Sequence, residues 1–113
     1  MPYSSGSVVN LSANTKSANV MSGDINEFVS FPALVRIYNI SSASGIRVSV
    51  NVDSDVVIDD KEINAIGTSL LRPDHLVDEF EIEAGSRITM TFRETAGAST
   101  TDILWGVEIV PID

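Results

Sequence analysis

The chain has 113 residues, of which 43% are hydrophobic, which is enough for one globular domain with its own core and too many for a disordered chain. It contains no cysteine, and this excludes disulfides, thiol nucleophiles and thiolate metal sites. Sixteen acidic residues against seven scattered basic ones give a net charge of −9, so we expect binding to neither nucleic acid nor anionic membranes. The first twenty residues lack the pattern of a signal peptide, and no apolar run approaches the length of a membrane span.

The N-terminal segment, residues 1–23, has no acidic residue and is rich in Ser, Asn and Gly. It predicts either a loose terminus followed by a first strand or two, or an arm that reaches across a neighbouring subunit. Because acidic residues begin at Asp24, we divide the single domain into residues 1–23, an arm with the first strand, and residues 24–113, a β-sandwich. The apolar residues of the expected first strand or two are Val8, Val9, Leu11 and Val20.

Alternation of apolar and polar residues predicts strands through most of the remaining chain. The clearest strand is 46–52, whose four apolar residues all point one way, whereas 34–40 is apolar on both faces, with Leu34, Tyr38 and Ile40 on one of them. Further strands are predicted at 55–58, 62–67, 80–83, 87–93 and 103–112, with Phe80, Phe92 and Trp105 facing the core.

A helical period is not sustained anywhere in the chain, and the best helical candidate, RPDHLVDEF at 72–80, allows one or two turns at most. Seven to nine short strands with this spacing predict an all-β fold, an antiparallel β-sandwich or jelly roll with at most one short helix.

The stretch DSDVVIDDKE, residues 53–62, holds five carboxylates. It fails as a calcium loop of the EF-hand type, because Val57 and Asn64 stand where that motif needs acidic ligands. We therefore expect acidic, solvated strand ends around a buried Val56–Ile58 segment, and no cofactor. A looser calcium site remains as an alternative, built from Asp53, Asp55, Asp59 and Asp60.

Motifs for catalysis are missing from the sequence, so we predict that the protein is not an enzyme. There is no G-x-S-x-G, no phosphate-cradling glycine motif, and a single histidine, His75. Tyr3 and Tyr38 are the aromatic residues that are suited to a sugar-stacking platform.

Two segments near the C-terminus, EIEAGSRITMTFR (81–93) and TTDILWGVEIVPI (100–112), form a hairpin-like pair around the small-residue loop ETAGASTTD. Together with the start SSGSVVNLSANTKS, this pattern resembles small accessory proteins of viral capsids, especially the head-decoration proteins of tailed phages. The resemblance implies a structural protein of the virion that binds and stabilises a capsid as a homo-oligomer, with a trimer favoured. The major capsid protein or another virion protein would be its partner.

Symmetric assembly would bury apolar residues that a monomer leaves exposed. Leu70 and Leu71 have an alternative place in the core of the same monomer. Two other functions stay open, a carbohydrate- or receptor-binding sandwich module and a calcium-dependent adhesion domain. The candidate interface residues are Val8, Val9, Leu11, Leu34, Tyr38, Leu70 and Leu71.

Overall fold

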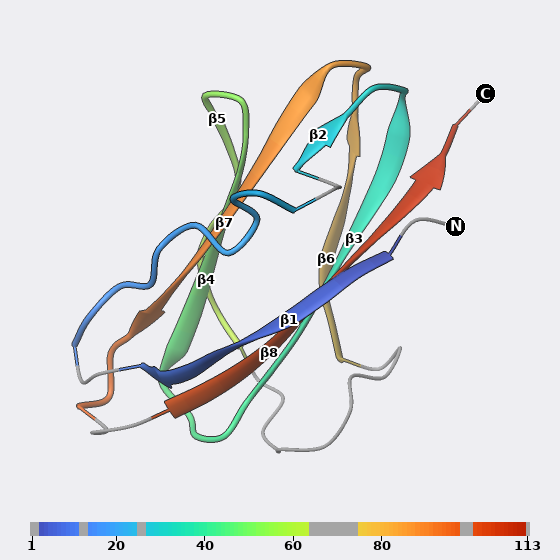
Figure 1. Cartoon of the computed structure of the whole chain (residues 1–113). Coiled ribbons are helices and arrows are strands. Elements are labelled where there is room, and N and C mark those ends of the chain that lie inside the picture. The colour runs from blue at the N-terminus through green and yellow to red at the C-terminus, as the bar shows by residue number, and fades with distance from the viewer. Residues whose placement is uncertain (1–2, 12–13, 25–26, 64–74, 98–100, 113) are drawn as a thin grey trace.

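The protein is an all-β sandwich of eight strands, as predicted (Figure 1). The structure is a computed structural model that describes residues 3–11, 14–24, 27–63, 75–97 and 101–112. At residues 9 and 10 it describes only the backbone. No α-helix occurs in the described part of the chain, and His75 alone has a 3₁₀ conformation. The strands are β1 (Tyr3–Leu11), β2 (Phe28–Val29), β3 (Ala33–Ser41), β4 (Ile46–Val52), β5 (Asp55–Glu62), β6 (Leu76–Ile82), β7 (Ser86–Glu94) and β8 (Thr101–Pro111).

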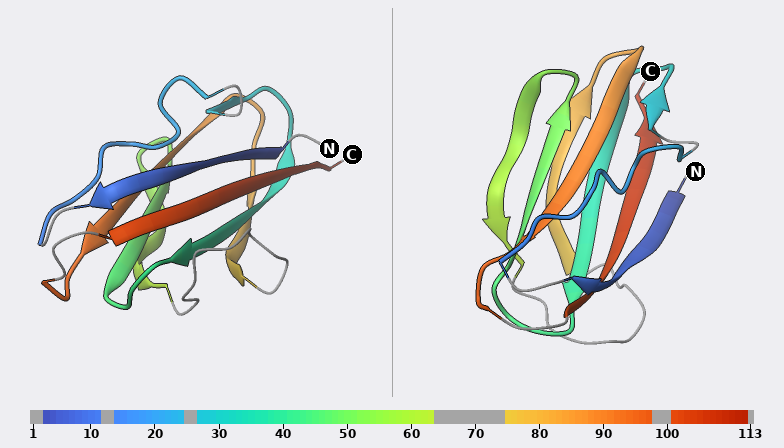
Figure 2. Two further views of the ribbon diagram at one scale, coloured as in Figure 1. Left: turned by 60° about the horizontal axis from the view of Figure 1, so that its bottom comes forward. Right: turned by 60° about the vertical axis from the view of Figure 1, so that its left-hand side comes forward.

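The strands form two antiparallel sheets, β1-β8-β3-β6 and β2-β7-β4-β5, which pack face to face (Figure 2). Strands pair as β1 with β8, β2 with β7, β3 with β6 and β4 with β5, so the chain resembles one long hairpin wrapped into two layers. This is the strand order of an eight-stranded jelly roll. The alternation of apolar and polar residues predicts where strands lie in the sequence. It does not predict the order of the strands in the sheets, which depends on how the long hairpin folds over into two layers.

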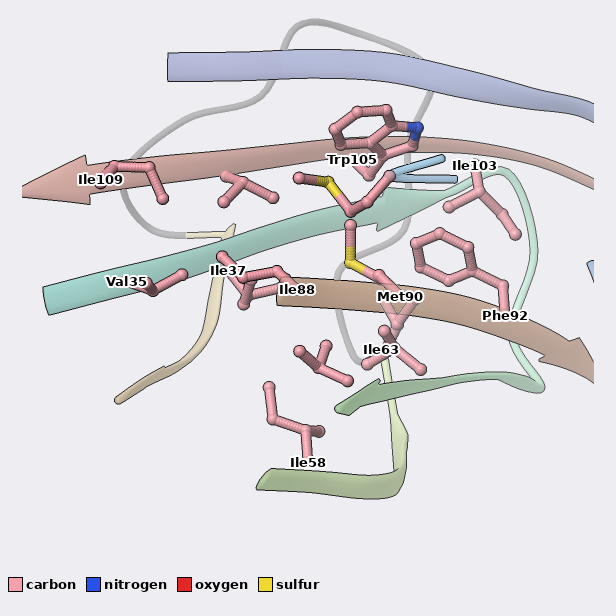
Figure 3. Packing of buried hydrophobic residues seen from close by; sticks show 14 of the residues in the cluster. Val35, Ile37, Ile58, Ile63, Ile88, Met90, Phe92, Ile103, Trp105 and Ile109 are labelled. Carbon is pink, nitrogen blue, oxygen red and sulfur yellow. The ribbon is translucent and has the colours of Figure 1, made fainter. Parts of the chain in front are cut away.

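The core lies between the two sheets and follows the alternation along each strand. Phe92 and Met90 of β7 are fully buried, and they lie opposite Ile37 of β3 and Trp105 of β8 (Figure 3). Phe92 and Trp105 therefore face the core as predicted, and Phe80 is partly buried against it.

The helix predicted at 72–80 is wrong over Leu76–Phe80, which belong to β6, while residues 72–74 lie outside the described part of the chain. The register with β3 shifts between Ile37 and Tyr38, where β6 accommodates one extra residue. This bulge sets Val77 and Phe80 three residues apart although both pack against the core. A spacing of three is also typical of a helix face, which explains the error.

Two further segments differ from the sequence prediction. The strand β5 continues to Glu62, and Ile63 is buried in the core, so no separate strand begins at residue 62, while residues 64–67 are not described. The strand β2 has only two residues, which is too short to show any alternation in the sequence.

Residues 3–11 and 14–24 belong to the sandwich and do not project from it as an arm. Strand β1 pairs with β8 in the first sheet. The following segment runs along the edge of β7, where the backbone amides of Ser17 and Val20 donate to the carbonyls of Phe92 and Met90 over 2.7 and 2.9 Å. The division at residue 23 therefore does not separate two structural parts.

Candidate functional site

The outer face of the first sheet, called the first-sheet face below, is assembled by register from four strands. Side chains that point away from the core lie side by side in rows across β1, β8, β3 and β6, because paired residues share a face. The rows are Val110–Leu34–Glu81, then Tyr3–Glu108–Arg36–Glu79, then Ser5–Gly106–Tyr38–Leu76, and then Ser7–Leu104–Ile40. Ile40 is only 2% exposed and adds no accessible surface to this face.

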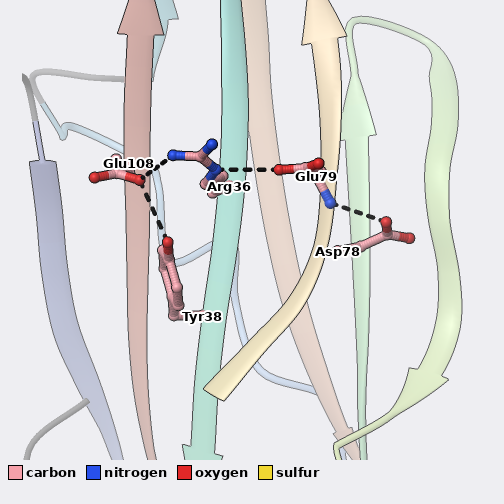
Figure 4. Close-up of polar contacts among 5 residues, drawn as sticks. All are labelled: Arg36, Tyr38, Asp78, Glu79 and Glu108. Carbon is pink, nitrogen blue, oxygen red and sulfur yellow. Dashed lines mark hydrogen bonds and ion pairs between the residues drawn. The ribbon is translucent and has the colours of Figure 1, made fainter. Parts of the chain in front are cut away.

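The second row is the polar centre of this face (Figure 4). The Arg36 guanidinium lies between two carboxylates, with its Nε 3.1 Å from Glu79 and its Nη1 3.1 Å from Glu108. Hydrogen bonds to Glu79 and then Glu108 raise the pKa of Arg36 above its ordinary value. All three side chains keep contact with solvent, since their exposed fractions are 36%, 49% and 23%. These three side chains can therefore give up their ion pairs with one another and bind groups of an incoming molecule instead.

Two tyrosines flank Glu108. Tyr38 on β3 donates its hydroxyl to Glu108 Oε1 over 3.3 Å, and Tyr3 on β1 lies directly opposite Glu108 in the sheet. Burial, followed by the Glu108 charge, raises the pKa of both phenols above the ordinary value. Both tyrosines consequently stay neutral and offer an apolar ring with a polar tip, the combination that suits a surface meeting another molecule.

Apolar side chains surround the polar row on both sides. Leu34 and Val110 lie on one side of it and Leu104 on the other, all half-buried, while Leu76 is 43% exposed. Gly106 separates Tyr38 from the serines of β1 and adds no side chain of its own. The first-sheet face thus has apolar side chains on both sides of the charged row, with Glu81 and the serines of β1 at its margins.

Two of the predicted interface residues, Leu34 and Tyr38, lie on the first-sheet face. Val8 is half-buried against the core, and Leu11 is only 8% exposed within it, so the structure removes Leu11 from the candidates. The reason is that β1 is a paired strand whose alternate residues face inward. The side chain of Val9 and residues Leu70 and Leu71 lie outside the described part of the chain.

The acidic stretch forms the turn after β4 and the edge strand β5. Ile58 is buried as predicted, but Val56 and Val57 are 57% and 38% exposed, so the expectation of a buried Val56–Ile58 segment is wrong for two of its three residues. The register with β4 shifts twice along β5, and these bulges turn the two valines outward.

Asp60 is bound into the sheet. It has a positive φ of 50° at a bulge, its amide donates to Ser49 Oγ over 3.1 Å, and its carbonyl accepts from Arg47 over 2.9 Å. Its carboxylate pairs with Arg93, and this hydrogen bond is the main cause that lowers the pKa of Asp60.

Asp53 is also engaged, because its Oδ1 accepts from the Arg87 amide over 3.1 Å. In the described ranges no three His, Cys, Asp or Glu residues come together in a way that could hold a metal ion. The four aspartates proposed as calcium ligands are therefore not assembled into a site. Asp60 serves instead as a structural clamp between β5, β4 and β7.

The outer face of the second sheet, called the second-sheet face below, has a different composition. Its outward residues on β4 and β7 are Arg47, Ser49, Asn51, Arg87, Thr89, Thr91 and Arg93. At one end Phe28 is 65% exposed, with the Arg87 guanidinium 5.7 Å from its ring centroid, and Arg87 also pairs with Glu27 over 2.8 Å. The side chains here are hydroxyls, amides and arginines held by neighbouring carboxylates.

The charged row on the first-sheet face was missed by sequence reasoning. Alternation within 34–40 correctly places Leu34 and Tyr38 on one face, and Arg36 between them must share it. However, Glu79 and Glu108 lie 43 and 72 residues away in the chain, so only the strand register reveals them.

The comparisons with known proteins add no family to this description: no protein-family model matches the chain, and no curated protein matches its sequence. Among the described residues, no helix has the length and apolar content needed to span a membrane. The fold and the site define an all-β jelly-roll protein with one apolar outer face.

Proposed function

We propose that the chain is a structural protein of a virus particle, a decoration or accessory protein that binds a capsid as a homo-oligomer. The observation that carries this proposal is the first-sheet face, where apolar side chains of β3, β6 and β8 lie on both sides of the Tyr3–Glu108–Arg36–Glu79 row. The partner would be the major capsid protein or another protein of the virion.

The composition of the first-sheet face supports a protein partner. Interfaces are enriched in tyrosine, arginine and apolar residues, and the residues that dominate binding energy are most often Trp, Tyr and Arg. Tyr38 and Arg36 lie next to each other at the centre of the face and share Glu108 as a partner. Burial of this row against a matching surface would fix the register of the two proteins, because its charges discriminate against a wrong alignment.

The fold is compatible with this proposal, but it is shared by functions of several kinds. Jelly rolls occur in viral capsid proteins, lectins and cupins, so the site has to decide between them. The net charge of −9 supports the assembly role, because acidic outer surfaces keep copies soluble and mutually repelling until a specific contact forms.

Co-sedimentation with empty capsid shells, assembled from the major capsid protein that accompanies this chain, tests the proposal. We expect the wild-type protein to sediment with the shells and Leu104→Glu to lose at least about tenfold in affinity, because a buried unpaired carboxylate is costly. Thr89→Glu, on the second-sheet face, is the matched control and should bind as the wild type does. Absence of binding by folded wild-type protein, or equal binding by both variants, would contradict the proposal.

A second function is favoured by one observation, the position of Tyr3 and Tyr38 on either side of Glu108. Two tyrosine rings beside a carboxylate and a guanidinium are suited to stacking on a sugar and bonding its hydroxyls. Titration with neutral oligosaccharides, followed by Trp105 fluorescence and calorimetry, separates the two functions. Saturable sugar binding that Tyr38→Ala abolishes would favour the carbohydrate-binding module over the capsid protein.

A further inference from the structure

The charged row on the first-sheet face carries more negative than positive charge. Arg36 stands between Glu79 and Glu108, so the row has two carboxylates against one guanidinium. Glu81 lies in the neighbouring row and adds a further carboxylate, while Arg36 is the one base in the four rows. A partner that covers this face therefore has to bring positive charge, because carboxylates that lose water without a matching cation are costly.

Each carboxylate of the row has one oxygen that Arg36 does not use. Arg36 Nη1 and the Tyr38 hydroxyl both donate to Oε1 of Glu108, over 3.1 and 3.3 Å, and Arg36 Nε donates to Oε2 of Glu79 over 3.1 Å. Figure 4 shows the other oxygen of each carboxylate directed away from Arg36. A carboxylate has about four lone-pair sites, so both ends of the row can accept from an incoming donor.

The two tyrosines make the Glu108 end of the row suited to a cation in particular. Tyr3 lies opposite Glu108 on β1 and is 49% exposed, and Tyr38 binds Glu108 from the neighbouring row. An aromatic ring attracts a guanidinium or ammonium group through its quadrupole, in addition to the attraction of the carboxylate. This combination favours an arginine or lysine side chain over an anion.

Apolar side chains beside the row show what has to surround this cation. Leu34 and Val110 lie on one side of the row, and Leu104 and Leu76 lie on the other. Apolar groups that close over an ion pair exclude water from it, and this strengthens the attraction between the charges. A protein surface with apolar residues around its basic side chains supplies both parts, whereas a small cation supplies only one.

From this charge pattern we infer that the first-sheet face docks on a protein surface that is basic at its centre and apolar around it. One arginine or lysine of the partner bonds Glu108 beside the tyrosines, and a second one bonds Glu79. The two sites are separated by β3, so the two basic groups stand about 10 Å apart, which is two strand spacings. Arg36 stays between the carboxylates and holds both in place. The inference rests on the proposed function and states the chemistry of the capsid surface.

Binding to the empty capsid shells at several salt concentrations tests the sign of the charge. The affinity of the wild type should fall between about 50 and 300 mM salt, since screening weakens attraction between opposite charges. Glu79→Gln with Glu108→Gln should lower the affinity at low salt at least about tenfold and flatten the salt dependence. Asp55→Asn with Asp59→Asn, on β5, removes the same charge from exposed positions outside this face and should change neither property. Trp105 fluorescence should show that each variant is folded.

The direction of the change separates this inference from its alternatives. If the partner bound Arg36 through an acidic group, removal of the two carboxylates would strengthen binding instead. If the substitutions acted only by leaving Arg36 unpaired in the interface, affinity would fall without any change in the salt dependence. Either result would overturn the inference and leave the capsid role standing.

A peptide probe tests the same chemistry without the capsid. In an NMR titration at millimolar concentration, the peptide Leu-Arg-Leu-Arg-Leu with blocked ends should shift the resonances of Tyr3, Tyr38 and Leu104. The same peptide with glutamate in place of arginine should not shift them. Equal binding of both peptides, or of neither, would overturn the inference. Shifts caused by the arginine peptide alone, with wild-type protein that does not bind the shells, would support the inference and overturn the capsid role.

Discussion

The two outer faces of the sandwich share one core and differ in almost every other respect. On the first-sheet face, apolar residues lie on both sides of the charged row around Arg36, and Glu81 lies beside Leu34. On the second-sheet face, hydroxyls and arginines dominate along β4 and β7, and Arg93 and Arg87 are each paired with a carboxylate of the same chain. Phe28 and Val56 are exposed on β2 and β5, at the two margins of this sheet. A face that only has to meet water takes the second form, so the first form indicates a surface that meets another molecule.

The edges of the two sheets differ less than their faces. The second sheet ends in a strand with two bulges and many carboxylates, and its other end is covered by residues 15–24 and by Glu27. The first sheet ends on one side in β6, which has three acidic residues and one bulge. On the other side it ends in β1, whose register with β8 shifts between Val8 and Leu11 and whose Ser4 donates to Asp24. Edges of both sheets are thus protected by charge, bulges or covering residues.

The largest loss of stability is expected at a core residue that packs between the two sheets. Phe92→Ala removes a fully buried ring between the sheets and should lower the free energy of unfolding by about 3–5 kcal/mol, because the cavity is only partly filled by relaxation. Thr91→Ala, next in sequence but on the second-sheet face, should cost less than about 1 kcal/mol. Urea unfolding followed by Trp105 fluorescence measures both, and equal losses would mean that the inward and outward assignments are wrong.

A smaller loss of stability is expected at β1, the edge strand of the first sheet. Gly6→Ala places a methyl group against the Trp105 ring and should cost about 1–3 kcal/mol, typical of overpacking. Ser5→Ala, which points away from the core, is the control. If the two substitutions shift the urea midpoint equally, the Trp105 ring does not pack closely against β1 at Gly6.

The second-sheet face should be sensitive to acid. The pKa of Glu27 is lowered by the Gly23 amide and then by Arg87, and the pKa of Asp60 is lowered by Arg93. The folded state thus binds fewer protons than the unfolded state, and the stabilisation is complete above the ordinary pKa, near pH 4, and is lost as the pH falls below it. Urea midpoints measured from pH 7 to pH 2.5 should fall less steeply for Asp60→Asn than for the wild type. Identical profiles would mean that the Arg93 pair contributes nothing.

The first-sheet face should be sensitive to alkali instead. Because the pKa values of Tyr3 and Tyr38 are raised, the folded state keeps phenol protons that the unfolded state releases. Stability is then complete below about pH 10 and declines as the pH rises above that value. Tyr38→Phe should show a shallower decline in the same urea series at pH 9–11, and an unchanged slope would contradict the proximity of this phenol to Glu108.

The smallest effect on stability is expected for the charged row itself. Arg36→Gln breaks two ion pairs whose side chains remain in contact with solvent, and such pairs contribute little to folding. The urea midpoint should therefore hardly move, while binding to capsid shells should weaken. A large loss of stability with unchanged binding would make the row a structural feature and would remove the main distinction between the two faces.

Sequence reasoning succeeded where alternation is long and regular, as in 46–52, 87–93 and 103–112, since each of these strands buries every second residue. It failed at β6, where a bulge gives Val77 and Phe80 a helix-like spacing, and at β5, where bulges turn Val56 and Val57 outward. A bulge shifts the phase of alternation by one residue and leaves no other mark in the sequence.

The candidate site was predictable only in part. The outward side of 34–40 followed from alternation, which placed Leu34 and Tyr38 together on one face. The carboxylates that complete the row around Arg36 lie on β6 and β8, and their positions depend on strand order and register. The protection of the edges likewise became visible only when the order of strands in each sheet was known.

The most direct test of the account is the solution mass of the wild-type chain, measured by light scattering over a wide range of concentration. The account predicts that the mass rises above that of the 12.1 kDa monomer to that of a homo-oligomer. A mass that stays at the monomer value at every concentration, with the protein folded, would contradict the assembly role that the first-sheet face supports.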